Sequence, residues 1–153
     1  EKKEKPKEKT EILVDLARPI DILIAEDNPI NQKVIKKIMA KLGLQAEIAG
    51  NGLEVLDALE KKSYDLILMD MQMPEMDGLQ ATREVRKLDS STLAKQPIII
   101  ALTANAMESE KRDCFKAGMD DFLAKPVRWE LLAQTLEKWF GKEAELMRVQ
   151  QQP

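Results

Sequence analysis

Apolar stretches alternate with amphipathic stretches along most of this chain. Short runs rich in aliphatic and β-branched residues predict five buried strands, at 20–25, 45–49, 64–69, 97–102 and 121–124. Between and after them, apolar residues recur every three or four positions, which predicts helices at 29–42, 53–61, 78–88, 107–117 and 128–140. Capping residues support the helix ends: Asn28 and Pro29 at the start of the first, and Gly43 and Gly118 as stops.

Strands that alternate with helices in this way predict an α/β fold. Near-continuous apolar strands are typical of a parallel sheet whose two faces are both covered by helices. We therefore expect a doubly wound sheet of five βα units with right-handed crossovers. Ligands of such folds bind outside the carboxyl ends of the strands, which is where candidate chemistry should be sought.

The two ends of the chain have a different composition. Residues 1–11 contain five Lys and four Glu, so we expect 1–18 to be a charged linker, with a short apolar patch around Val14 resting on the domain. Residues 142–153 form a polar tail that permits a helix but is expected to fray. The remaining segment, 19–141, is the predicted domain.

Composition excludes several classes of function. The 153 residues carry a net charge of -3 and an isoelectric point near 5.2, which argues against a nucleic-acid-binding protein. No apolar run approaches the roughly 20 residues that span a bilayer, so we expect no direct membrane contact in this segment. One cysteine and a charged N-terminus suggest a cytoplasmic location. The chain has no histidine, which rules out histidine-based catalysis and histidine-ligated metals within it.

Polar residues follow four of the five predicted strands. Glu26 and Asp27 follow the first strand, Asp70 ends the third, Thr103 ends the fourth and Lys125 follows the fifth. Three carboxylates brought together need a counter-charge, which a Mg²⁺ ion supplies well because it prefers oxygen ligands. With a lysine and a hydroxyl left to bind anionic oxygens, this set is suited to phosphoryl transfer onto an aspartate. Each residue alone is more simply explained as a helix cap or a loop residue; the combination favours chemistry.

Four segments carry a resemblance to a known family: 22–28, 65–78, 99–104 and 117–126. They resemble the receiver domain of two-component response regulators, over about 20–140. The resemblance implies a flavodoxin-like fold with strand order 2-1-3-4-5. Residues 26–32 further resemble the receivers at the C-terminal end of hybrid sensor histidine kinases, and a stand-alone receiver is the alternative.

The resemblance also implies which residues act at the site. Asp70 would accept the phosphoryl group from a phosphohistidine, on a histidine kinase domain or a histidine phosphotransfer protein. Asp27 would bind Mg²⁺ directly and Glu26 through water, and Asp70 and the backbone carbonyl of Gln72 would complete the ligands. The domain would not be an enzyme in the usual sense, but would catalyse its own phosphorylation and dephosphorylation.

Three further roles concern the phosphorylated state. Lys125 would pair with one phosphate oxygen, and the Thr103 hydroxyl would donate to another. Phe122 occupies the position of the family's aromatic switch and would turn inward as Thr103 moves. The family also has a cis peptide bond at the position of Lys125-Pro126.

Two other classes of function compete with this interpretation. Phosphatases of the haloacid dehalogenase type also place a nucleophilic Asp after a parallel strand, but they need a second Asp two residues later, where this chain has Gln72. A receiver scaffold that only binds partners, without phosphorylation, would not need the complete set of acidic residues, Thr103 and Lys125.

Overall fold

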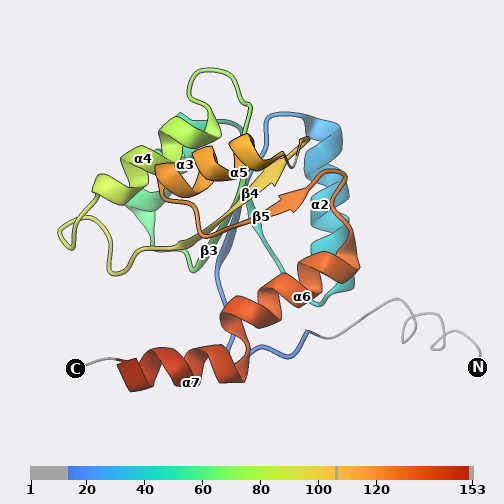
Figure 1. Ribbon diagram of the computed structural model, residues 1–153, viewed down its shortest axis with the longest axis vertical. Helices are drawn as coiled ribbons and strands as arrows, with labels where there is room; N and C mark the ends of the chain where they lie inside the picture. The colour runs from blue at the N-terminus through green and yellow to red at the C-terminus, as the bar shows by residue number, and fades with distance from the viewer. Residues whose placement is uncertain (1–13, 106, 152–153) are drawn as a thin grey trace, which may run out of the picture.

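Five parallel strands form the central sheet of the structure (Figure 1), a computed structural model that describes residues 14–105 and 107–151. The strands are β1 (Ile22–Ala25), β2 (Glu47–Ala49), β3 (Leu66–Asp70), β4 (Ile98–Thr103) and β5 (Asp121–Ala124). Their order is β2-β1-β3-β4-β5, and every neighbouring pair is parallel. This confirms the predicted fold class and strand order. The charged residues 1–11 of the predicted linker lie outside the described residues.

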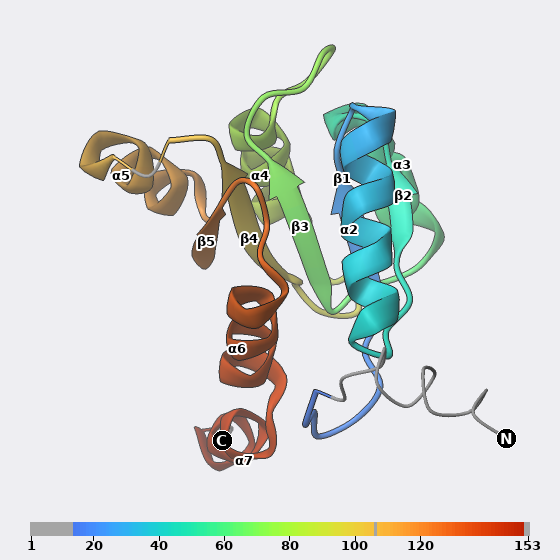
Figure 2. The same cartoon turned by 90° about the vertical axis from the view of Figure 1, so that its right-hand side faces the viewer.

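Helices cover both faces of this sheet, as Figure 2 shows. These helices are α2 (Pro29–Lys41), α3 (Gly52–Lys61), α4 (Gly78–Lys87), α5 (Glu108–Ala117) and α6 (Trp129–Phe140), and a further helix, α7 (Lys142–Gln151), follows α6. Helices α2 and α6 pack on one face of the sheet, whereas α3, α4 and α5 pack on the other. None of the helices in the described part of the chain is long and apolar enough to cross a membrane.

Alternation along the strands explains why both faces are apolar. In β3, Leu66 and Leu68 point into the layer under α2 and α6, while Ile67 and Met69 point into the layer under α3, α4 and α5. All four side chains are fully buried, so β3 has no polar face. This central position fixes the carboxyl end of β3, where Asp70 stands, within a rigid framework.

The predicted caps are present at the helix ends. The Asn28 side chain accepts hydrogen bonds from the backbone N–H groups of Ile30 at 2.8 Å and Asn31 at 3.1 Å. Gly43 and Gly118 have φ values of 76° and 111°, in the left-handed region that favours glycine. These signals placed the ends of α2 and α5 correctly from the sequence.

The C-terminal segment adopts the helix that its sequence permits. Residues Lys142–Gln151 form helix α7, which packs against the end of α6. The Arg148 guanidinium donates to the Trp139 carbonyl at 2.7 Å, and Arg18 lies 3.4 Å from Glu145. These partners lie on α6 and near the start of the described chain, so the local pattern of α7 could not reveal them.

Residues 14–18 are held at the same end of the sheet. Ala17 N–H donates to the Phe140 carbonyl at 2.9 Å, and Arg18 pairs with the buried Asp65 at 3.1 Å. Burial acts to raise the pKa of Asp65, but hydrogen bonds from Lys95, from the Asp21 backbone and from Arg18 outweigh it and lower the pKa. The boundary predicted at residue 18 stays a prediction, but the apolar patch at Val14 does contact the domain.

Candidate functional site

Three carboxylates meet at the carboxyl end of the sheet. Glu26 and Asp27 follow β1, and Asp70 is the last residue of the neighbouring strand β3. One carboxylate oxygen from each of the three side chains lies within 4.8 Å of the other two. Glu26 and Asp70 are buried, whereas Asp27 is exposed. The parallel pairing of β1 and β3 thus brings together residues that are far apart in sequence, as predicted.

Lys125 reaches the same cluster from the end of β5. Its Nζ lies 3.2 Å from Asp70 Oδ2 and 3.4 Å from Glu26 Oε1. The peptide bond between Lys125 and Pro126 is cis, as the resemblance implied. One ammonium group therefore faces two buried carboxylates.

The electrostatics of the cluster favour a further cation. Burial, and next the charge of Glu26, raise the pKa of the Asp70 carboxyl above its usual range, against the opposing effect of Lys125. Burial acts to lower the pKa of Lys125, but the charges of Asp70 and Glu26 and their hydrogen bonds outweigh it and raise the pKa. Three carboxylates and one ammonium leave excess negative charge, and Asp27 offers its oxygens toward solvent. This donor set fits a hard divalent ion such as Mg²⁺.

The loop from β1 into α2 holds Glu26 in place. Glu26 Oε2 accepts from Asn28 N–H at 3.1 Å and from Asn31 Nδ2 at 3.4 Å, and the Glu26 carbonyl accepts from Gln32 Nε2 at 2.6 Å. With Lys125 on Oε1, both oxygens of this carboxylate are engaged. The sequence showed Asn28 as a cap, and it showed Gln32 only as part of the segment 26–32 that resembles hybrid-kinase receivers, so the bond from Gln32 to the Glu26 carbonyl was not predicted.

The loop after β3 shapes the other side of the site. Gln72 has an exposed side chain, and its backbone N–H points toward Asp70 Oδ1 at 3.4 Å. Two glycine N–H groups anchor the loop: Gly78 donates to the Met71 carbonyl at 3.1 Å and Gly52 donates to the Met76 carbonyl at 2.9 Å. The loop is therefore built around Asp70 and tied to α3 and α4.

The two predicted switch residues lie on the neighbouring strands β4 and β5. Thr103 is the buried last residue of β4, and its hydroxyl contacts the Asn105 carbonyl and the Glu110 carboxylate of α5. Phe122 in β5 is half-buried and packs edge-to-face on Phe115, with ring centroids 6.2 Å apart. Within the described residues, the Thr103 hydroxyl makes no hydrogen bond to Asp70 or Lys125, whereas the Thr103 carbonyl accepts from the Lys125 N–H at 2.8 Å. Glu110 was not singled out from the sequence, because its contact with Thr103 depends on how α5 packs.

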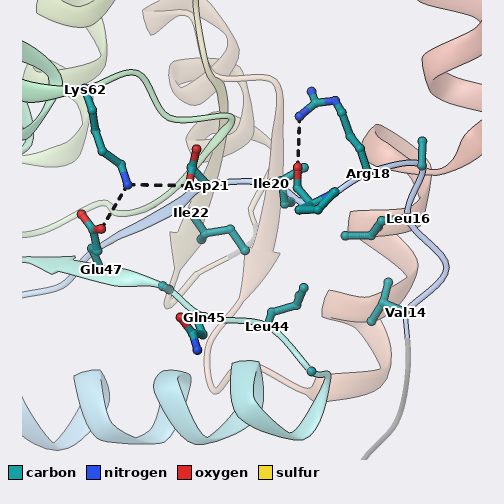
Figure 3. A pocket seen from close by; sticks show the side chains of 14 residues that line it. Val14, Leu16, Arg18, Ile20, Asp21, Ile22, Leu44, Gln45, Glu47 and Lys62 are labelled. Carbon is teal, nitrogen blue, oxygen red and sulfur yellow. Dashed lines mark hydrogen bonds and ion pairs between the residues drawn. The ribbon is translucent and has the colours of Figure 1, made fainter.

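A cavity of about 650 Å³ lies at the opposite end of the sheet (Figure 3). Residues before and at the starts of β1 and β2 line it, together with Val14 and Leu16. Its charged groups are paired, with Lys62 Nζ at 3.1 Å from Glu47 and 3.6 Å from Asp21. The cavity contains none of the predicted site residues, so the chemistry belongs to the carboxyl rim.

Comparisons with known proteins agree with the architecture. The family model described as the response regulator receiver domain matches residues 22–137. Hybrid signal transduction histidine kinase K of Dictyostelium discoideum is 44% identical over 122 residues, which are 77% of this chain and 10% of that kinase. The sensor histidine kinase GacS of Pseudomonas protegens is 40% identical over 120 residues, 78% of this chain and 13% of that protein. The chain thus spans about a tenth of the length of these relatives.

Solved structures show the same fold. The receiver domain of a Pseudomonas aeruginosa sensor histidine kinase, which holds magnesium in its active-site cleft, is 39% identical with a TM-score of 0.70, covering 80% of this chain and 98% of that one. A co-crystal structure joins a Saccharomyces cerevisiae histidine phosphotransfer protein to the receiver domain of its downstream response regulator. It matches with a TM-score of 0.74 and 31% identity, over 82% of this chain and 92% of that one.

The family match runs from β1 into α6, and so includes every strand of the sheet and the loops that carry the acidic cluster, Thr103 and Lys125. The relatives that share these elements are histidine kinases and response regulators. This chain belongs to the response regulator receiver domains of two-component phosphorelay systems.

Proposed function

We propose that this domain is a phosphorylation-dependent switch that accepts a phosphoryl group on Asp70. The observation that carries the proposal is the convergence of Glu26, Asp27, Asp70 and Lys125 at one point of the rim. Asp70 is the only one of these carboxylates that ends the central strand, and it lies directly against the lysine. An aspartate nucleophile next to a fixed positive charge suits transfer of a negatively charged group.

The transfer step uses groups that the chain provides. A carboxylate oxygen of Asp70 attacks the phosphorus of a phosphohistidine in line, the P–N bond breaks, and its electron pair leaves with the imidazole. Lys125 offsets the negative charge on the phosphoryl oxygens as a compact point charge. Attack of water on the aspartyl phosphate later returns phosphate and the free carboxylate, so the same residues catalyse both the gain and the loss of the group.

Mg²⁺ is the cofactor that the acidic cluster fits. Asp27, Asp70 and the Gln72 carbonyl would hold the ion directly, and Glu26 would hold it through water. When bound, the ion adds positive charge beside the transferred oxygens, which lowers the repulsion between phosphoryl group and carboxylates. Glu26 already has both oxygens engaged by Lys125, Asn28 and Asn31, which favours its indirect role.

A direct experiment tests the assignment. The protein is treated with acetyl phosphate and Mg²⁺, and its mass and the modified residue are measured. We expect one phosphoryl adduct, on Asp70. Steady hydrolysis of unrelated phosphoesters would instead indicate a phosphatase, and no adduct at all would indicate a scaffold that only binds partners.

The partners follow from the chemistry of the donor. The phosphoryl group comes from a phosphohistidine on a histidine kinase domain or on a histidine phosphotransfer protein, because this chain has no histidine. The kinases among its relatives favour a receiver that works within a longer hybrid kinase in the cytoplasm, where the histidine kinase domain is its neighbour. A stand-alone receiver is the alternative.

Loss of a metal ligand should weaken Mg²⁺ binding according to how directly the ligand acts. We expect Asp27→Ala to lower Mg²⁺ affinity at least about tenfold, and Glu26→Ala to lower it less, because a water-mediated ligand contributes less than a direct one. The measurement is an amide NMR titration of the metal-free protein with MgCl₂. Asp57→Ala, which removes an exposed carboxylate from α3, is the control and should bind as the wild type does. Equal affinity for Asp27→Ala and wild type would remove Asp27 from the ligand set.

An exposed apolar residue beside the rim should contribute to docking of the phosphohistidine donor. Ile30 is 72% exposed and lies in the first turn of α2, next to the acidic loop. We expect Ile30→Asp to slow transfer from a phosphotransfer protein about tenfold, since an exposed apolar anchor at an interface contributes on this scale. The rate of phosphorylation by acetyl phosphate, which needs no docking, should change less than about twofold. The variant should fold, because acidic residues in a first helical turn are well tolerated.

The matched control is Leu146→Asp. Leu146 is 58% exposed on α7, at the far end of the sheet from the acidic cluster. This variant should leave transfer from both donors unchanged. If Ile30→Asp slows both donors equally, then Ile30 supports the structure of the site and does not contact the partner.

A further inference from the structure

The hydroxyl of Thr103 already has a partner in the unphosphorylated protein. It contacts a carboxylate oxygen of Glu110 on α5, and it lies 2.8 Å from the Asn105 carbonyl. Asn105 N–H donates back to the same hydroxyl at 3.1 Å. Thr103 is 2% exposed, so water does not replace these partners readily.

A threonine hydroxyl has one proton to donate. Glu110 and the Asn105 carbonyl compete for that proton, and an ionised carboxylate is the stronger acceptor of the two. A phosphoryl oxygen on Asp70 would be a third acceptor for the same proton. Donation by Thr103 to a phosphoryl group therefore requires that its contact with Glu110 is given up.

The same turn of α5 also contacts the second switch residue. Lys111, next to Glu110 in the chain, places its Nζ 4.6 Å from the centre of the Phe122 ring. Phe115, one turn later on α5, packs against Phe122 at an interplanar angle of 75°. Helix α5 thus holds Thr103 through a carboxylate and Phe122 through a cation and an aromatic ring.

From this geometry we propose that Glu110 is a positioning residue, an internal anion that holds the Thr103 hydroxyl in its unphosphorylated arrangement and opposes the switch. The proposal rests on the function proposed above for Asp70 and Thr103. Before transfer, Glu110 accepts the hydrogen bond of the Thr103 hydroxyl that a phosphoryl oxygen would accept after transfer. Displacing Glu110 costs free energy, which weakens binding of a phosphoryl group at Asp70. This cost sets the balance between the unphosphorylated and phosphorylated arrangements.

Removal of this competing charge should favour the phosphorylated arrangement. With beryllofluoride as the phosphoryl mimic and Mg²⁺ present, we expect Glu110→Gln to bind about tenfold more tightly than the wild type, since a hydrogen bond to a charged group is replaced by a weaker one. Without beryllofluoride, the amide NMR signals of Phe122 and its neighbours should shift part of the way toward their bound positions. A titration followed by NMR measures both effects on the intact protein.

Glu108→Gln provides a matched control. Glu108 and Glu110 both lie in the first turn of α5, so each substitution removes one negative charge from the same helix end. Glu108 is exposed and is the residue that begins the helix. We expect its affinity for beryllofluoride to stay within about twofold of the wild type, because a general effect on the helix dipole is small.

A double-mutant comparison tests whether Glu110 acts through the hydroxyl. In a Thr103→Ala background there is no hydroxyl to hold, so Glu110→Gln should bring no further gain in affinity. A gain that persists in this background would overturn the proposal, as would equal affinities for Glu110→Gln and Glu108→Gln. Wild-type protein that binds no beryllofluoride would overturn the proposed function itself, which is a distinct outcome from the failure of Glu110 alone.

Discussion

The substitution Asp70→Asn should abolish phosphorylation while leaving the fold intact. Asparagine matches aspartate in shape but has no anionic oxygen to attack phosphorus, so no adduct should form with acetyl phosphate or with a phosphohistidine donor. Asp70 is 5% exposed and lies against Glu26, whose charge adds to burial in raising its pKa. The folded protein therefore disfavours the ionised form of this carboxyl, and the neutral amide should leave the metal-free domain at least as stable as the wild type.

Two measurements check this result. Mass spectrometry after acetyl phosphate treatment gives the extent of labelling, and thermal unfolding in metal-free buffer gives the stability. Asp57→Asn is the control, because it makes the same chemical change at an exposed position on α3 and should label normally. Persistent labelling of Asp70→Asn at an unchanged position would exclude Asp70 as the acceptor.

The fold was predictable because each local signal agreed with the others. Buried strands such as Leu66–Asp70 have no polar face, so their apolar runs were clear in the sequence. Asn28 and Gly118 marked helix ends because these residue types favour the capping conformations that they adopt here. Strand order is different: it depends on which apolar runs pair, and it came from the resemblance alone. Helix α7 was not predicted as a stable element, because Arg18 and the Trp139 carbonyl stabilise it from outside its sequence.

For the candidate site, the residues at the strand ends were predictable, whereas the contacts made by helix side chains were not. The position of Asp70, Glu26 and Lys125 at the ends of parallel strands follows from topology, so their convergence could be expected from the order of strands and helices along the chain. Contacts made by side chains of the helices could not be expected from that order. Glu110 reaches Thr103, and Gln32 reaches the Glu26 carbonyl, only because of how α5 and α2 are packed and which rotamers they allow.

The close approach of the start of α4 to the backbone of Asp70 explains why residue 78 is a glycine. A Cβ atom added to Gly78 would lie 2.2 Å from the Asp70 carbonyl oxygen, far inside the roughly 3.5 Å at which nonbonded heavy atoms make favourable contact. The opposing atom is backbone at the end of the central strand, so a side-chain rotation cannot relieve the clash. We expect Gly78→Ala to lower the free energy of unfolding by about 3 kcal/mol, as overpacking at a rigid site does.

The same clash should reach the chemistry, because the carbonyl that must move belongs to the phosphoacceptor itself. Displacement of Asp70 relative to Lys125 and the other carboxylates should slow labelling by acetyl phosphate about tenfold, even below the melting temperature. Chemical denaturation and the initial labelling rate are the two measurements. Gly50→Ala is the matched control: the atoms nearest to its added Cβ belong to the movable Glu54 carboxylate, the first at 3.2 Å, so stability should change by less than about 1 kcal/mol. If Gly78→Ala unfolds and labels as Gly50→Ala does, then the backbone around Asp70 yields to a methyl group and the rigid rim that we infer does not exist.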